Sequence, residues 1–211
     1  MKLSKNEELK TVYWMENKLY LNITNNCSNC CFFCLKNFKR GVGGFNLKLS
    51  EEPSVAQIIR ELGEVLSIRS WDEVVFCGFG EPTERLDILL EIARWIKLHY
   101  GRPLRIRLNT NGHGYVLNQG RDVAAELKGA GVEKVSVSLN AGDKETYEEI
   151  CRPNFADAYD AMIDFIRKAK LVLEVEATAV RMPEVDIAKA QEVADGLGIK
   201  FRIREYIPCF Y

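Results

Sequence analysis

The feature that most constrains the fold of this chain is a strand-like segment followed by a helix-like segment, repeated along its length. Short runs of β-branched and aromatic residues alternate with longer segments whose apolar residues recur every three or four positions. Such alternation is typical of a parallel sheet joined by right-handed crossovers, with helices packed outside. The predicted strands are 18–24, 73–79, 104–109, 134–140, 172–180 and 200–206. The predicted helices are 55–66, 123–127, 156–169 and 187–197, and a further helix that begins at 86 and ends near a Gly-Arg-Pro breaker at 101–103.

Six strands favour an incomplete (β/α)6 TIM-like barrel, open on one side, because the closed barrel of this type has eight strand–helix units. A doubly wound open sheet is the alternative. A further strand-like segment at 11–15, separated from the first strand by Glu16-Asn17, predicts an N-terminal β-hairpin. We therefore expect a single α/β domain over 1–211, with a hairpin arm at 1–17 and the partial barrel at 18–206.

Polar and apolar residues alternate within the last four predicted strands, which gives each strand one apolar face. In a barrel the apolar face packs on the helices, so the polar face points to the interior. Unpaired buried charges cost several kcal/mol, and we expect the interior Arg and Glu side chains to neutralise one another. The predicted interior residues are Arg105, Arg107, Asn109, Ser136, Ser138, Asn140, Glu174, Glu176, Thr178, Arg202, Arg204 and Tyr206.

A cluster of cysteines directly follows the first strand, as Cys27, Cys30, Cys31 and Cys34. Thiolates this close in one loop, with no histidine among them, favour a soft metal or an iron–sulfur cluster over a disulfide framework. Two interpretations stay open. Four thiolates could close a tetrahedral zinc site, although adjacent ligands fit one tetrahedron poorly. Alternatively, Cys27, Cys31 and Cys34 form a Cys-x3-Cys-x2-Cys triad that leaves one iron of a cluster open to another ligand.

Three further motifs fall at the C-terminal ends of predicted strands, the rim where barrels of this type carry their active sites. Gly-Phe-Gly-Glu-Pro-Thr occupies 78–83, Asn-Thr-Asn-Gly occupies 109–112, and Ser-Leu-Asn-Ala-Gly-Asp occupies 138–143. Each alone is an ordinary turn sequence. Their shared position beside the cysteine loop indicates one ligand site, in which glycines allow close backbone approach and Glu81 accepts from an ammonium group.

Taken together, these motifs resemble the radical SAM superfamily. The strings Leu-Tyr-Leu-Asn-Ile-Thr-Asn-Asn-Cys and Glu-Thr-Tyr-Glu-Glu-Ile-Cys-Arg-Pro are similar to the TatD-linked radical SAM proteins, and this similarity runs over 12–206. The resemblance implies a [4Fe-4S] cluster held by Cys27, Cys31 and Cys34, whose fourth iron S-adenosylmethionine chelates. It also implies that Gly78, Gly80, Glu81, Asn109, Ser138, Asn140 and Arg204 contact S-adenosylmethionine.

The reaction implied by the resemblance is reductive cleavage of S-adenosylmethionine to a 5′-deoxyadenosyl radical, which abstracts hydrogen from an unidentified substrate. An electron donor such as flavodoxin or ferredoxin is the implied partner, and the subfamily adds a functional link to a TatD-type nuclease. Two alternatives stay open: an activase that acts on a partner protein, and a non-catalytic zinc-binding module.

Charge and hydropathy exclude some functions. The chain has 29 Lys and Arg residues against 30 Asp and Glu residues, a net charge of -1, so no global charge draws it to nucleic acid or to an anionic membrane. No apolar stretch is long enough to span a bilayer, and the polar N-terminus is unlike a signal peptide. We therefore expect a cytoplasmic protein with no membrane partner, whose seven cysteines are reduced.

The remaining cysteines and one histidine receive structural predictions. Free cysteine is commonly buried, so Cys77 is expected to be a buried structural residue. Cys151 and Cys209 follow strand ends and could reach the rim, whereas His113, in a Gly-rich turn, is expected to be exposed. Phe33 and Phe79, next to the motifs, are expected to keep water from the cluster.

Overall fold

A computed structural model of the chain describes residues 11–38, 41–100 and 104–206. Within these residues, a seven-stranded sheet has six parallel strands in sequence order. They are β2 (Lys18–Leu21), β5 (Glu73–Phe76), β6 (Arg105–Thr110), β7 (Lys134–Ser138), β8 (Glu174–Arg181) and β9 (Lys200–Glu205). β1 (Val12–Met15) pairs antiparallel with β2, which confirms the predicted hairpin and the six-stranded parallel sheet.

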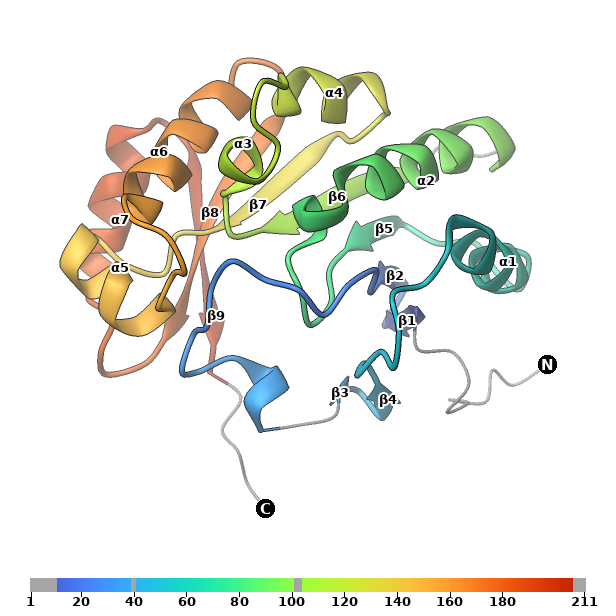
Figure 1. Cartoon of the computed structure of the whole chain (residues 1–211), viewed down its shortest axis with the longest axis horizontal. Coiled ribbons are helices and arrows are strands. Elements are labelled where there is room, and N and C mark those ends of the chain that lie inside the picture. Colours follow the sequence, from blue (N-terminus) through green and yellow to red (C-terminus); the bar gives the residue numbers. More distant parts are fainter. Residues whose placement is uncertain (1–10, 39–40, 101–103, 207–211) are drawn as a thin grey trace.

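The sheet stays open, because in the described chain β1 and β9 are both edge strands. A doubly wound sheet reverses its strand order at a switch point. Here the order runs from β2 to β9 without reversal, and Figure 1 shows the helices in an arc outside the strands. The predicted partial barrel, open on one side, is therefore confirmed, and the doubly wound alternative is wrong.

Helices connect successive parallel strands, and polar caps set where several of them begin. Ser54, Asp122, Asp143 and Asp186 each accept a hydrogen bond from the backbone N–H three residues later, which satisfies one free donor of the first turn. The helices are α1 (Val55–Leu66), α2 (Leu86–His99), α3 (Gly114–Leu117), α4 (Val123–Gly129), α5 (Lys144–Cys151), α6 (Ala158–Ala169) and α7 (Ile187–Gly196), with 3₁₀ turns η1 (Leu35–Asn37) and η2 (Pro82–Arg85).

The structure contains elements on the rim that the sequence did not predict, among them the short helix α3. The segment after β7 contains α5, a charged helix that the apolar spacing did not reveal; its few apolar side chains, including Tyr147 and Cys151, are all buried. The Gly-rich link after the cysteine loop contains a two-stranded hairpin, β3 (Gly41–Val42) and β4 (Phe45–Asn46). The predicted breaker at 101–103 lies outside the described residues.

The two faces of the sheet divide as the alternation predicts. Ile106, Leu108, Val135 and Val137 are fully buried in the core between strands and helices. Their neighbours of opposite parity, Arg107 among them, line the other face. The arrangement stabilises the fold because each apolar face removes hydrocarbon from water while each charged side chain keeps a polar surrounding.

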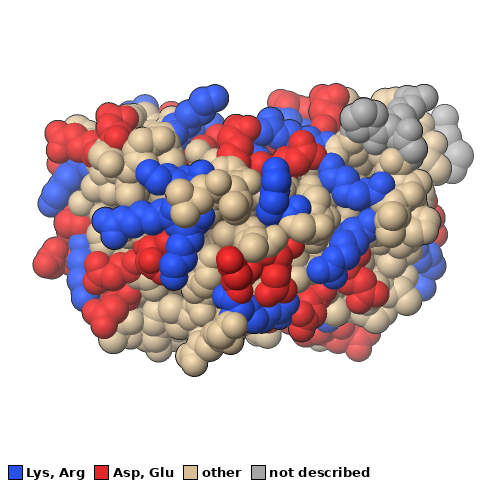
Figure 2. All heavy atoms as spheres, turned by 90° about the horizontal axis from the view of Figure 1, so that it is seen from above, with Lys and Arg blue, Asp and Glu red and all other residues tan. Residues whose placement is uncertain are grey.

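The outer surface has no dominant charge on the face seen in Figure 2, where Lys and Arg side chains are interspersed with Asp and Glu side chains. This mixed pattern agrees with the nearly zero net charge of the chain. Across the described residues, none of the helices combines the length and the apolar character that a membrane crossing requires.

Candidate functional site

A cavity of about 1230 Å³ opens on the polar face of the sheet. The hairpin β1–β2 supplies Tyr13 and Tyr20, whose rings stack with centroids 5.0 Å apart. The cysteine loop reaches the cavity through Phe33 and Cys34. The cavity therefore joins the cysteine loop to the interior of the partial barrel, as expected for a site on the rim.

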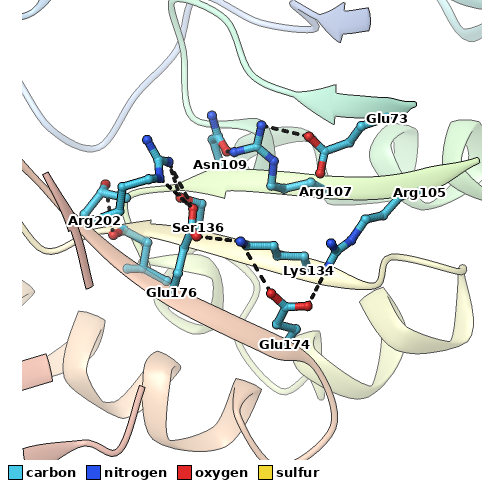
Figure 3. Close-up of polar contacts among 11 residues, drawn as sticks. Glu73, Arg105, Arg107, Asn109, Lys134, Ser136, Glu174, Glu176 and Arg202 are labelled. Atoms are coloured by element: carbon cyan, nitrogen blue, oxygen red, sulfur yellow. Dashed lines mark hydrogen bonds and ion pairs between the residues drawn. The ribbon is translucent and has the colours of Figure 1, made fainter. Parts of the chain in front are cut away.

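The floor of the cavity is a ladder of ion pairs across four strands (Figure 3). Arg105 pairs with Glu174, Lys134 bridges Glu174 and Glu176 at 3.4 and 2.5 Å, and Arg202 lies 3.0 Å from Glu176. Ser136 donates a further hydrogen bond to Glu176 at 2.9 Å. Two carboxylates thus serve three cations, and the predicted network of interior charges is confirmed.

A second ion pair lies beside this ladder. Arg107 contacts Glu73 at 3.0 Å, with both side chains about nine-tenths buried, and donates to Asn109 at 3.2 Å. Arg204 lines the same cavity and donates to Asn140 at 3.3 Å. Among the described residues no carboxylate pairs with Arg204, and burial lowers the pKa of its guanidinium. The cavity therefore has an excess of positive charge.

The glycines of the motif after β5 are required by packing against the entrance to the cysteine loop. A Cβ at Gly80 would lie 2.4 Å from the Asn26 carbonyl oxygen, and one at Gly78 would lie 1.9 Å from Oδ1 of Asn22. The same approach lets the Glu81 amide donate to the Asn26 carbonyl at 2.7 Å. The cysteine loop is thereby fixed to the end of β5.

The three cysteines of the triad are partly buried thiols on one loop. Burial, and next the charge of Glu81, raise the pKa of Cys27 to about 12. A hydrogen bond with Cys151 and burial raise the pKa of Cys31, and burial raises that of Cys34. A bound metal would lower the pKa of these thiols again, because a coordinating thiol is deprotonated. The three thiols of this loop offer sulfur donors alone, and thiolate donors fit an iron–sulfur cluster.

The single-ion alternative fits less well. A tetrahedral zinc site brings its sulfurs to about 2.3 Å from one ion. Over the ranges that the structure describes, no three His, Cys, Asp or Glu side chains converge closely enough to hold one ion, and Cys30 is exposed. A cluster spreads its thiolates over several irons, so it accepts donors that do not meet at one point.

Glu81 has a structural role that the sequence did not predict. Its carboxylate is 3 % exposed and accepts from the Thr83 amide and hydroxyl at 3.0 and 2.7 Å, from the Thr110 hydroxyl at 2.7 Å, and from the Asn111 amide at 2.6 Å. It therefore joins the ends of β5 and β6. Burial raises its pKa, which these hydrogen bonds oppose. A contact between Glu81 and an ammonium group stays a prediction.

His113 contradicts the sequence prediction, because it is fully buried rather than exposed. Its Nδ1 lies 2.8 Å from the Ser28 hydroxyl, and its Nε2 lies 3.1 Å from the Tyr147 hydroxyl, which accepts from Asn29. Asn111 donates to Ser28 at 2.8 Å and approaches the Cys27 sulfur at 3.8 Å. The turn between β6 and α3 thus holds the start of the cysteine loop, and only the polar Thr-Asn-Gly motif in the sequence marks it.

The predicted contacts of S-adenosylmethionine divide into two groups. Gly78, Asn109 and Arg204 line the cavity beside Cys34. Gly80, Glu81, Ser138 and Asn140 are not part of its lining, and Asn140 is 2 % exposed at the end of β7. None of these contacts is visible without the cofactor, so all seven remain predictions.

The other cysteines have different positions. Cys77 lines the cavity and is partly exposed, so the prediction of a buried residue is wrong. It directly follows β5 and lies an even number of positions after Glu73, so its side chain points to the cavity face as that of Glu73 does. Cys151 is fully buried against the cysteine loop. Cys209 lies outside the described residues.

Comparison with known proteins agrees with this arrangement. The family model described as the radical SAM superfamily matches residues 21–196. A probable GTP 3′,8-cyclase of Saccharolobus islandicus is 31% identical over 185 residues, which are 86% of this chain and 54% of the relative. The chain thus spans about half the length of the curated relatives that it matches.

Solved structures show the same fold at lower identity. HydG, a maturase of the [FeFe]-hydrogenase, gives a TM-score of 0.65 at 17% identity over 92% of this chain and 43% of that one. Methylornithine synthase (PylB) gives a TM-score of 0.64 at 15% identity over 90% of this chain and 53% of that one. The sulfur donor set, the partial barrel and the family match agree, and the chain belongs to the radical SAM superfamily, whose enzymes use a [4Fe-4S] cluster and S-adenosylmethionine.

Proposed function

We propose that this protein reductively cleaves S-adenosylmethionine and abstracts hydrogen from an anionic substrate bound in the cavity. The observation that carries the proposal is that Cys34, the last cysteine of the triad, opens onto a cavity with an excess of cationic side chains. The cluster and S-adenosylmethionine, when bound, supply a 5′-deoxyadenosyl radical. The protein supplies position, charge and exclusion of water.

Cys27, Cys31 and Cys34 would hold the cluster. Gly78, Asn109 and Arg204 are the best placed to contact S-adenosylmethionine, since they line the cavity beside Cys34. Ser138 and Asn140, at the end of β7, support the same rim, and the contacts of Glu81 fix the loops around it. Phe33 and Phe79 belong to the apolar part of the lining and would help to keep water from the cluster.

The charge of the cavity favours a substrate with a carboxylate or phosphate group. Two carboxylates serve Arg105, Lys134 and Arg202, while Arg204 pairs with no described carboxylate. A cation that lacks a partner in a partly buried site is costly, and a bound anion relieves that cost. The stacked Tyr13 and Tyr20 offer an aromatic surface in the same cavity.

A purine nucleotide is one substrate with both features. The similarity to proteins named probable GTP 3′,8-cyclase therefore supports, as a second candidate, a cyclisation of a guanine nucleotide by this chain or by a longer protein of which it is part. Anaerobic incubation with GTP, S-adenosylmethionine and a reductant, followed by mass spectrometry, tests this candidate. A new product with the mass of GTP supports it, and recovery of GTP alone contradicts it.

The general proposal is tested by anaerobic reconstitution with iron and sulfide. We expect the protein, reduced by dithionite or by a flavodoxin or ferredoxin donor, to release 5′-deoxyadenosine from S-adenosylmethionine. Cys31→Ala should abolish both iron binding and release, while Cys30→Ala, at the exposed cysteine of the same loop, should keep both. Zinc without iron or sulfide in anaerobically purified protein would select the non-catalytic zinc module instead.

A protein substrate is the remaining alternative, since the partial barrel is open on one side. Deuterium transferred from a labelled partner polypeptide to 5′-deoxyadenosine would favour an activase over an enzyme of small metabolites. The similarity to TatD-linked radical SAM proteins, and with it a link to a TatD-type nuclease, stays a prediction, because the relatives described above carry other names.

A further inference from the structure

The cysteine loop lies against the last turn of α5, and Cys31 is at the centre of this contact. The amide of Cys30 donates to the Cys151 carbonyl at 3.0 Å, and the amide of Phe32 donates to the Ile150 carbonyl at 3.2 Å. Because both neighbours of Cys31 are bonded to this turn, its side chain is held beside Cys151. The Cys151 thiol is the first cause, ahead of burial, that raises the pKa of Cys31, so the two thiols lie close enough to interact.

A chain of donors leads to this pair from the cavity. Arg204 donates through Nη2 to Oδ1 of Asn140 at 3.3 Å, and Nδ2 of Asn140 donates to the Cys151 sulfur at 3.7 Å. A guanidinium has only donors, so it fixes the amide oxygen of Asn140 toward itself and the amide NH2 toward Cys151. The Cys151 sulfur therefore accepts from Asn140, which leaves its own proton to donate to Cys31.

The position of Asn140 is fixed by the backbone as well. Its φ of 56° lies in the left-handed region, which asparagine tolerates better than most residues. The backbone amide of Asn140 donates to the Thr178 carbonyl at 3.1 Å, and the residue is 2 % exposed. Cys151 is fully buried, so water cannot replace either bond. Hydrogen bonds that point the same way along a buried chain strengthen one another.

We propose that Cys151 is a positioning residue for the cluster, whose S–H group donates a hydrogen bond to the Cys31 sulfur and raises the reduction potential. This inference rests on the proposed function, because it requires a cluster at Cys27, Cys31 and Cys34. Reduction adds one electron and makes the ligand sulfurs more negative, so a donor aimed at one of them stabilises the reduced state. Arg204 and Asn140 orient this donor.

The experiment compares reduction potentials at equal cluster content. Wild type, Cys151→Ala, Cys151→Ser and Cys30→Ala are reconstituted anaerobically, iron and sulfide are quantified, and each is titrated potentiometrically with electron paramagnetic resonance as the readout. We expect Cys151→Ala to lower the midpoint potential by about 59 mV, the equivalent of a tenfold change in a one-electron equilibrium. The midpoint potential of Cys151→Ser, which keeps a donor, should lie nearer to that of wild type. The midpoint potential of Cys30→Ala should equal that of wild type.

Two results would overturn the inference while leaving the proposed function intact. The first is a potential of Cys151→Ala equal to that of wild type. The second is loss of the cluster from both Cys151 variants with a native circular dichroism spectrum, which would make Cys151 a ligand rather than a donor. Wild type that binds no iron and sulfide would instead contradict the proposed function, and the inference with it.

Discussion

The Ser28 hydroxyl and Nδ1 of His113 lie 2.8 Å apart, although 85 positions separate them in the chain. One buried imidazole thus connects the residue after Cys27 to the turn that follows β6. Its other nitrogen contacts Tyr147 of α5, so three rim segments meet at a single ring. The start of the cysteine loop is thus held in part by a residue that lies far from it in the sequence.

The protonation of His113 predicts how stability depends on pH. Burial lowers the pKa of His113 to about 4, whereas the unfolded chain titrates near 6.5. The folded state keeps the ring neutral where the unfolded state takes up a proton. The neutral His113 ring therefore contributes its full share to the unfolding free energy above about pH 6.5. This share is lost as the pH falls to about 4, which lowers the unfolding free energy by about 3 kcal/mol. Urea unfolding across this range measures it.

The protein's other histidine provides the control for this measurement. His99 is exposed on α2, so His99→Gln should keep the wild-type pH dependence between about pH 6.5 and 4. His113→Gln should flatten it. Equal slopes for wild type and His113→Gln would contradict the prediction.

Gly80→Ala should separate the cysteine loop from β5. The added methyl group would lie 2.4 Å from the Asn26 carbonyl and 2.5 Å from that of Thr24, both backbone atoms that cannot move alone. We expect a loss of about 1–3 kcal/mol in unfolding free energy and lower iron content after reconstitution. Gly63→Ala, in the middle of α1 with nothing within 4 Å, is the matched control and should not destabilise the protein. Equal stability of the two variants would count against the packing argument.

Glu81→Gln should destabilise the protein even without S-adenosylmethionine. Glutamine replaces one of the two accepting oxygens with an NH2 group. This NH2 group would point at the Asn111 amide or at the donors on Thr83 and Thr110, so two buried donors would face each other without an acceptor. Such a mismatch costs about 1–3 kcal/mol. Urea unfolding of the apo protein measures the change. A variant as stable as wild type that binds S-adenosylmethionine more weakly would assign Glu81 to the ligand and not to the scaffold.

Two arginines of the cavity should respond differently to replacement by methionine. Arg107→Met leaves Glu73 buried without its partner, and we expect it to lose about 3–5 kcal/mol of unfolding free energy. Arg204→Met removes a cation that pairs with no described carboxylate, and we expect no comparable loss in the apo protein. Unfolding of both variants under the same anaerobic conditions makes the comparison. A similar loss for both would mean that Arg204 already has an anionic partner.

The sequence predicted the sheet and its interior because both depend on local periodicity. The alternation of Arg105 and Arg107 with Ile106 is a property of one strand, and it assigns faces without knowledge of the neighbours. The triad of cysteines is equally local, and its role as the ligand set of a cluster stays a prediction. The strands and their two faces match the structure, including the ion pair between β6 and β8.

The parts that the sequence did not reveal depend on contacts between distant segments. His113 stands in a Gly-rich turn, and its ring is buried where Tyr147 and Phe155 from later segments pack against it. The backbone hydrogen bonds between the cysteine loop and the last turn of α5 join residues that no local pattern relates. Helix α5 was missed because half of its residues are charged, and its capping residue Asp143 was the available signal.

The cysteine loop is bonded through its own backbone on both sides, to Glu81 after β5 and to the last turn of α5. Hydrogen bonds of the polypeptide itself therefore set its backbone path. We expect the folded protein to take up iron and sulfide directly, so that a cluster lost to oxygen can be restored without unfolding the chain.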